Sequence, residues 1–97
     1  MKTMIDYIKE FAPEGLEIAE VKADTYQYEI TFRYRGIQKK CWVHNDEEYP
    51  SIAEFQSRRT VVWIMERFAV ALHDDDMLAY WQKSPWYEKR PLSEIYC

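Results

Sequence analysis

The segment that decides the fold is TYQYEITFRYR, residues 25–35. Large apolar or aromatic residues occupy every second position, and polar or charged residues occupy the positions between them. A period of two places each set on one side of an extended strand. We therefore predict the central strand of a small antiparallel sheet, whose buried side carries Tyr26, Tyr28, Ile30, Phe32 and Tyr34.

Two further strands flank this segment. Residues 16–23 predict the first, with a turn at residues 22–24, and Val21 falls out of phase with Leu16, which either a β-bulge or an early end to the pairing would explain. Arg35 and Gly36 predict a two-residue loop into a third strand over residues 37–45. This loop places the apolar residues of both strands on one side. The expected cross-strand pairs are Tyr34 with Ile37, Ile30 with Cys41, and Tyr28 with Val43.

Helices are predicted at both ends of this sheet. Thr3 and Asp6 have the spacing of a capping box, and Pro13 and Gly15 end the first helix. Ser51 after Pro50 predicts the cap of a long helix that runs to about Leu72. Its expected buried stripe comprises Ile52, Phe55, Val62, Met65, Ala69 and Leu72, widened by Ile64, Phe68 and Ala71.

The acidic residues after this helix predict a second short helix from Met77 to Lys83, because Asp is a good N-cap. Leu78 and Trp81 would point inward. A continuous bent helix is the alternative. Residues 85–97 form a C-terminal tail, apolar enough to pack back on the domain. We therefore predict one domain over residues 1–97, of the α+β class: a three-stranded antiparallel sheet covered on one face by helices, in the order α-β-β-β-α-α.

Composition narrows the class of protein. The 97 residues include 16% aromatics, which suits a protein that binds another macromolecule, and the net charge is −4. No apolar signal-peptide core follows the N-terminus, and the longest mostly apolar run, residues 61–72, is interrupted by charges. Two cysteines, Cys41 and Cys97, do not suggest a disulfide framework. We therefore expect a cytoplasmic protein, in the cytoplasm of the host cell if it is encoded by a phage.

Motifs for catalysis or metal binding are weak. Cys41 and His44 have a metal-site spacing, but on a strand they point to opposite faces. Glu20 and Lys22 match a short piece of nuclease cores without the required upstream Asp. With two glycines and two histidines, the chain shows no phosphate loop and no nucleophile paired with a base. We expect no enzyme activity, no metal and no cofactor.

Two groups of charged residues are candidate binding sites. The first is acidic and lies in the loops before and after the long helix: Asp46, Glu47, Glu48, Asp74, Asp75 and Asp76. The second lies on the back of the sheet, where bases surround an aromatic residue: Arg33, Arg35, Lys40 and Trp42. The acidic loops predict contact with a protein partner, and the back face predicts phosphate contacts and base stacking. The alternative to a binding site on the back face is an ordinary solvated surface, on which Glu29 pairs across from Trp42.

The predicted order of elements resembles two families. The α-β-β-β-α part is similar to the double-stranded RNA-binding domain, although residues 50–54, PSIAE, stand where that family has a lysine cluster. The full order, with MIDYI at residues 4–8 and the acidic segments 46–48 and 74–76, resembles small phage-encoded anti-CRISPR proteins. That resemblance implies a non-enzymatic inhibitor that occupies the nucleic-acid-binding surface of a Cas9-type nuclease. The alternative function is a nucleic-acid-binding module that uses the back face.

Overall fold

The computed structural model describes residues 2–44, 50–87 and 95–96. Within these residues the elements, in chain order, are α1 (Met4–Phe11), β1 (Glu17–Ala23), β2 (Gln27–Tyr34), β3 (Ile37–His44), α2 (Pro50–Ala71), α3 (Asp75–Gln82) and β4 (Ile95–Tyr96). None of the helices in this part of the chain combines the length and apolarity that a membrane span requires.

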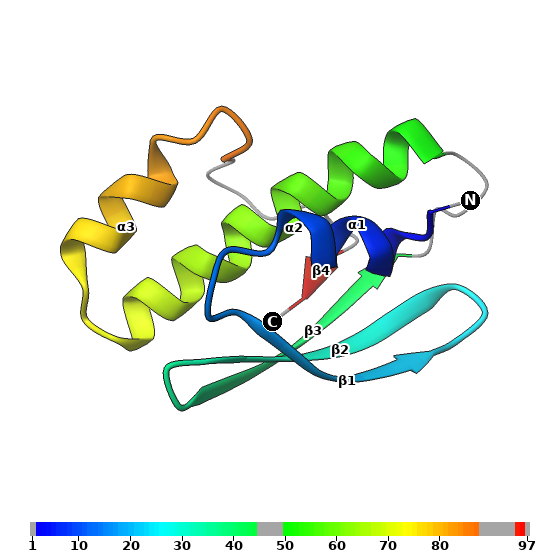
Figure 1. Cartoon of the computed structure of the whole chain (residues 1–97), viewed down its shortest axis with the longest axis horizontal. Helices are drawn as coiled ribbons and strands as arrows, with labels where there is room; N and C mark the ends of the chain where they lie inside the picture. Colours follow the sequence, from blue (N-terminus) through cyan, green and yellow to red (C-terminus); the bar gives the residue numbers. More distant parts are fainter. Residues whose placement is uncertain (1, 45–49, 88–94, 97) are drawn as a thin grey trace.

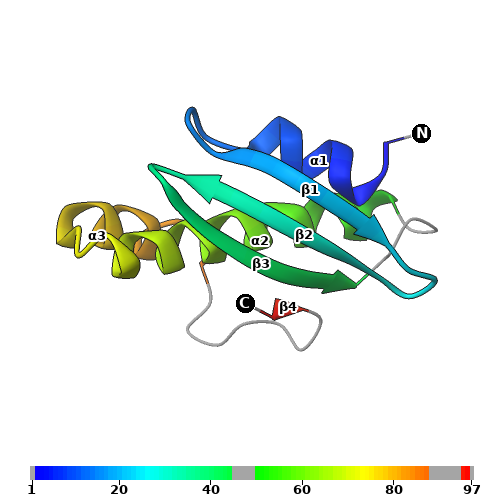
Figure 2. The same ribbon diagram turned by 90° about the horizontal axis from the view of Figure 1, so that it is seen from below.

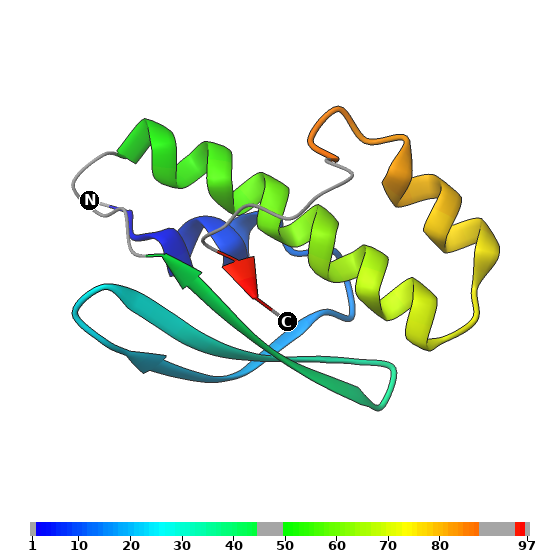
Figure 3. The same cartoon turned by 180° about the vertical axis from the view of Figure 1, so that it is seen from behind.

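The molecule has two layers. The strands form one antiparallel sheet in the order β1-β2-β3-β4, and α1 and α2 cover one of its faces (Figures 1 and 2). The third helix, α3, lies beside α2 (Figure 3). The predicted α+β fold and its element order are confirmed. The two-residue strand β4, which pairs with β3, was not predicted.

The strand register follows the period-two pattern. Tyr34 pairs with Ile37 across the loop, and Phe32 pairs with Lys39, so the predicted register is confirmed. Arg35 and Gly36 both have positive φ, at 50° and 81°, as a tight hairpin requires. The predicted bulge in the first strand is confirmed as a register shift between Ile18 and Glu20.

The turn predicted at residues 22–24 lies further along the chain. The strand β1 continues to Ala23, and β2 begins at Gln27. Between them the backbone N–H of Asp24 donates to the carbonyl of Gln27 over 2.8 Å. The Asp24 carboxylate also accepts from the N–H of Thr25, which favours the turn after Asp24 rather than before it.

The predicted capping box of α1 is confirmed. The Thr3 hydroxyl accepts from the Asp6 N–H over 3.2 Å, and the Asp6 carboxylate accepts from the Thr3 N–H over 3.0 Å. The hydrogen bonds with Thr3 lower the pKa of the Asp6 carboxyl from its ordinary value of 3.8, and the bond from the Thr3 backbone N–H has the largest effect. The fixed first turn directs Met4 and Ile8, both fully buried, into the core.

The start and the buried face of α2 differ from the prediction. The helix begins at Pro50, a favoured first helical residue, so Ser51 is inside it and is not its cap. Ile52 and Phe55, expected in the buried stripe, are 45% and 46% exposed. Their places on the core side are taken by small or polar residues.

These polar residues are accommodated by hydrogen bonds to the backbone. The buried Ser57 hydroxyl donates to the Ala53 carbonyl over 2.6 Å and approaches the Met4 carbonyl at 3.3 Å. The buried Thr60 hydroxyl donates to the Gln56 carbonyl over 2.8 Å. Because Ser and Thr can satisfy their hydroxyls in this way, an apolar pattern misses them. The small Ser57 also lets α1 approach α2 closely.

The junction between α2 and α3 is a break and not a bend. His73 has a φ of 54°, which ends α2, and Asp74 caps α3 by accepting from the Met77 N–H over 3.0 Å. The alternative of one continuous helix is therefore wrong, and α3 begins at Asp75 instead of Met77. Met77 and Trp81 pack against the core, whereas Leu78, expected to point inward, is half-buried outside it.

Candidate interaction surfaces

The back face of the sheet, away from the helices, carries charges that meet across strands. The Arg33 guanidinium lies 3.6 Å from the Glu17 carboxylate, and the Lys40 ammonium lies 3.6 Å from Glu29. Both pairs follow from the strand register. Glu17 lies directly opposite Arg33, and Glu29 lies two residues from Thr31, the residue opposite Lys40. The predicted basic surface is therefore a surface of charge pairs.

The aromatic residue of this face is also less available than expected. Trp42 lies between Glu29 on β2 and Tyr96 on β4 in the register, and it is half-buried. Thr31, in the next row, is 5% exposed, whereas Arg33 on the same face of β2 is exposed.

One ion pair connects the two candidate sites that we predicted from the sequence, the acidic loops and the basic back face. Arg35, at the tip of the β2–β3 hairpin, lies 3.7 Å from the carboxylate of Asp74, the cap of α3. Its guanidinium also lies 5.1 Å from the centre of the Tyr34 ring. Asp74 thus has two structural roles, as a helix cap and as a partner for the hairpin.

The remaining predicted acidic residues divide into two groups. Asp46, Glu47 and Glu48 lie outside the described residues. Asp75 and Asp76 lie in the first turn of α3 and are exposed, where negative charge also complements the helix dipole. Of the described acidic candidates, these two are open to a partner.

Sequence reasoning missed an aromatic–arginine surface, which we define as Phe11, Phe55, Arg58 and Trp86. These residues come from α1, α2 and the segment after α3. The Arg58 guanidinium lies 4.0 Å from the centre of the Phe11 ring and 5.3 Å from that of Trp86. Phe55 meets Trp86 edge-on, with ring centres 5.5 Å apart at 74°.

A cavity of about 180 Å³ opens at this surface. Phe11, Trp86 and Arg58 form one part of its wall, and Val61, Val62, Trp81 and Ser84 form the rest. Arg58 is held over the cavity by Glu54, one turn earlier on α2, at 3.2 Å. The wall is thus mostly apolar, with one fixed cation at its edge.

The segment that supplies Trp86 contacts α2. The Trp86 N–H donates to the Ser84 hydroxyl within this segment, over 3.2 Å. Next to it, burial and the nearby Glu66 carboxylate of α2 raise the pKa of the Tyr87 phenol. The indole of Trp86 itself meets Arg58 and Phe55 of α2.

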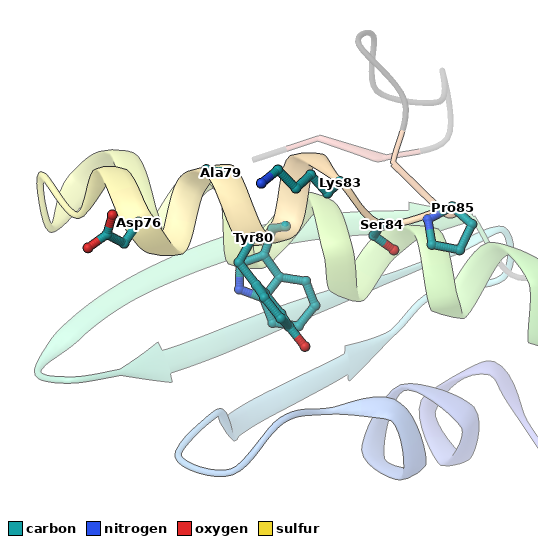
Figure 4. A pocket seen from close by; sticks show the side chains of 7 residues that line it. Asp76, Ala79, Tyr80, Lys83, Ser84 and Pro85 are labelled. Atoms are coloured by element: carbon teal, nitrogen blue, oxygen red, sulfur yellow. The ribbon is translucent and has the colours of Figure 1, made fainter.

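A second cavity, of about 540 Å³, lies along α3. Figure 4 shows Asp76 toward the first turn of the helix, Tyr80 in the middle and Lys83 at its end. Tyr80 is 69% exposed, although its ring meets that of Trp81 edge-on at 5.1 Å. No sequence motif indicated this cavity, because residues of these types are common on the exposed side of a helix and in the turn that follows it.

The cysteine chemistry corrects an expectation. Cys41 is fully buried and is part of a disulfide bond, although the number and spacing of the cysteines did not suggest a disulfide framework. The other cysteine of the chain, Cys97, lies outside the described residues. Within the described ranges no cluster of three His, Cys, Asp or Glu residues could hold a metal ion. A sulfur held in a disulfide is not a thiolate ligand, so the Cys41–His44 spacing has no support as a metal site.

Comparison with protein families, with curated proteins and with solved structures finds no match to this chain.

Proposed function

We propose that this protein is a small, non-catalytic interaction protein that binds a protein partner through its aromatic–arginine surface. The observation that carries the proposal is the meeting of Phe11, Arg58 and Trp86, from three separate segments, at one cavity, with the exposed Phe55 ring against Trp86 beside it. Trp, Arg and large aromatic residues are enriched where protein interfaces hold most of their binding energy.

The chemistry of the surface suggests how a partner would bind. The cavity is large enough for one apolar side chain, and Phe11 and Trp86 are part of its wall. The half-exposed Phe55 ring packs against Trp86 and would extend the contact beyond the cavity. Arg58 is already close to Glu54, so it would contribute mainly through its planar face and its stem. The partner would thus present an apolar anchor and not a strongly acidic patch.

A narrower form of the proposal is inhibition of a nucleic-acid-binding protein, such as a CRISPR nuclease. Its support is the exposed pair Asp75 and Asp76, which would face the basic surface of such a partner, and the net charge of −4. Direct binding of nucleic acid is less well supported, because Arg33, Arg35 and Lys40 each lie within 4 Å of an acidic group.

The test is affinity capture with quantitative mass spectrometry, using the wild-type chain and two matched variants. Phe55→Ser removes a half-exposed ring of the aromatic–arginine surface. Tyr26→Ser removes a 74% exposed ring at the β1–β2 turn and is the control. We expect a partner that wild type and Tyr26→Ser both enrich and that Phe55→Ser loses by at least about tenfold, the effect of a moderate interface residue.

Two results would count against the proposal. In the first, the captured partner binds all three chains equally, which would show that the aromatic–arginine surface is not the binding site. In the second, no captured protein at all is lost with Phe55→Ser, which would reject the proposal in the same way. The narrower form is tested with a purified Cas9-type nuclease in a DNA-cleavage assay. Cleavage unaffected by an excess of wild-type protein would reject inhibition of that enzyme.

A further inference from the structure

The outward side of α3 carries a short, self-complementary stripe: Asp76, Ala79, Tyr80 and Lys83. The spacing i, i+3, i+4 and i+7 places all four on one face of the helix. The same four residues line the cavity of about 540 Å³ along α3 (Figure 4). Asp76, Ala79, Tyr80 and Lys83 are all exposed.

Tyr80 is the apolar centre of this stripe. It is 69% exposed, and among the described large apolar residues Tyr26 alone is more exposed. Its ring meets the Trp81 ring edge-on at 90°, with the centres 5.1 Å apart. A large exposed aromatic ring of this kind is a residue type that protein interfaces favour.

The charges of the stripe have opposite signs at its two ends. Asp76 lies in the first turn, and Lys83 follows the last turn, about 10.5 Å away at 1.5 Å per residue. When two copies of this helix lie antiparallel about a two-fold axis, Asp76 of each faces Lys83 of the other. The same axis sets Tyr80 of each copy against the small Ala79 of the other, which lets the helices approach closely.

We propose that α3 pairs with α3 of a second copy of this chain in an antiparallel, two-fold symmetric dimer. The proposal goes beyond the proposed function, because it uses the outward stripe of α3 and not the aromatic–arginine surface. Such an interface is isologous, so one stripe supplies both halves of every contact. A helix of eight residues buries less than a standard interface, so the dimer is weak and sensitive to salt.

The experiment is analytical ultracentrifugation of the full chain from about 10 μM to about 1 mM, at low and high salt, which spans weak association. We expect wild type to shift from monomer to dimer over this range, less so at high salt. Tyr80→Ser, Asp76→Lys and Lys83→Asp should each raise the dissociation constant at least about tenfold. The double variant D76K/K83D, which exchanges the two charges, should recover most of the dimer.

The controls separate pairing from general effects. Glu14→Lys makes the same change in net charge as Asp76→Lys, but in the exposed turn between α1 and β1, outside the stripe, and should leave the dimer intact. Far-ultraviolet circular dichroism of each variant reports whether the total helix content is kept, and Tyr80→Ser alters a residue that is 69% exposed. The proposal is overturned if wild type stays monomeric at the highest concentration. It is also overturned if Tyr80→Ser dimerises like wild type, or if the folded double variant fails to recover.

Discussion

The back face of the sheet and the aromatic–arginine surface use the same residue type in opposite ways. On the back face, Arg33 lies near a carboxylate, 3.6 Å from Glu17, and both side chains are about half exposed. On the other surface, Arg58 lies over the rings of Phe11 and Trp86, and its side chain is 35% exposed. Both arginines have a carboxylate partner, Glu54 in the case of Arg58, but of these two only Arg58 is also packed on aromatic rings.

The difference teaches where binding energy can reside. Exposed ion pairs contribute little, because the attraction is screened by water and salt and two long side chains must be held in place. A guanidinium on an aromatic ring gains both electrostatic attraction and buried area. A count of positive residues therefore favours the back face as a binding site, whereas the contacts favour the surface built on α1 and α2.

The largest effect is expected from reduction of the disulfide bond of Cys41, on strand β3 of the sheet. We expect a reducing agent to lower the free energy of unfolding by about 2–4 kcal/mol, as is typical when a native disulfide is lost. Urea unfolding with and without reductant measures the loss. Cys41→Ala should be insensitive to reductant, since its disulfide is already absent.

The same samples identify the second sulfur. Non-reducing peptide mapping would find Cys41 linked to Cys97 within one chain or to a cysteine of another molecule. Equal stability of wild type in the presence and absence of reductant would show that the disulfide does not stabilise the fold.

The comparison itself is tested by two matched substitutions, Arg58→Met and Arg33→Met. Both remove a guanidinium and keep an apolar stem. We expect Arg58→Met to cost about 1 kcal/mol of unfolding free energy, from two cation–ring contacts, and Arg33→Met to cost less than about 0.5 kcal/mol. Urea midpoints at low and high salt measure both. A larger loss for Arg33→Met would reverse our ranking of the two surfaces.

The smallest expected effect concerns the capping box of Thr3 and Asp6, which begins α1, the helix that supplies Phe11 to the aromatic–arginine surface. The pKa of Asp6 is lowered in the folded chain, so the ionised carboxylate stabilises the fold. This contribution is complete above the ordinary value of 3.8 and is lost as the pH falls through the lowered pKa. Circular dichroism in urea from about pH 5 to about pH 2 should show the decline. Asp6→Ala should remove this component, and an unchanged profile in that variant would assign the decline to other carboxyl groups.

Local patterns predicted most of the fold. The alternation in residues 25–35 gave the central strand, and Arg35-Gly36 gave its register with β3, because a two-residue loop fixes which residues face each other. Thr3 and Asp6 gave the start of α1 for the same reason: a capping box is complete within four residues. Each of these features depends on neighbours in the sequence.

The candidate sites could be predicted far less well. The residues of the acidic and basic groups were identified, but the ion pair between Arg35 and Asp74 joins positions 39 residues apart. Ile52 and Phe55 were assigned to the core because Ser57 and Thr60 interrupt the apolar pattern of the true buried face. One signal was available: the exposure of Ile52 and Phe55 would have been suspected if Ala53 and Ser57 had been considered as close-packing residues.

The sequence by itself determined the three long strands, the register of β2 with β3 and the start of α1, because these depend on dihedral preferences, side-chain alternation and caps within a few residues. Only the tertiary structure decided which charges are paired, which rings of α2 stay exposed and that Cys41 is oxidised. Such properties depend on atoms brought together from distant segments, such as Phe11, Arg58 and Trp86. Contact energies between those segments follow packing geometry, which no local pattern in the chain encodes.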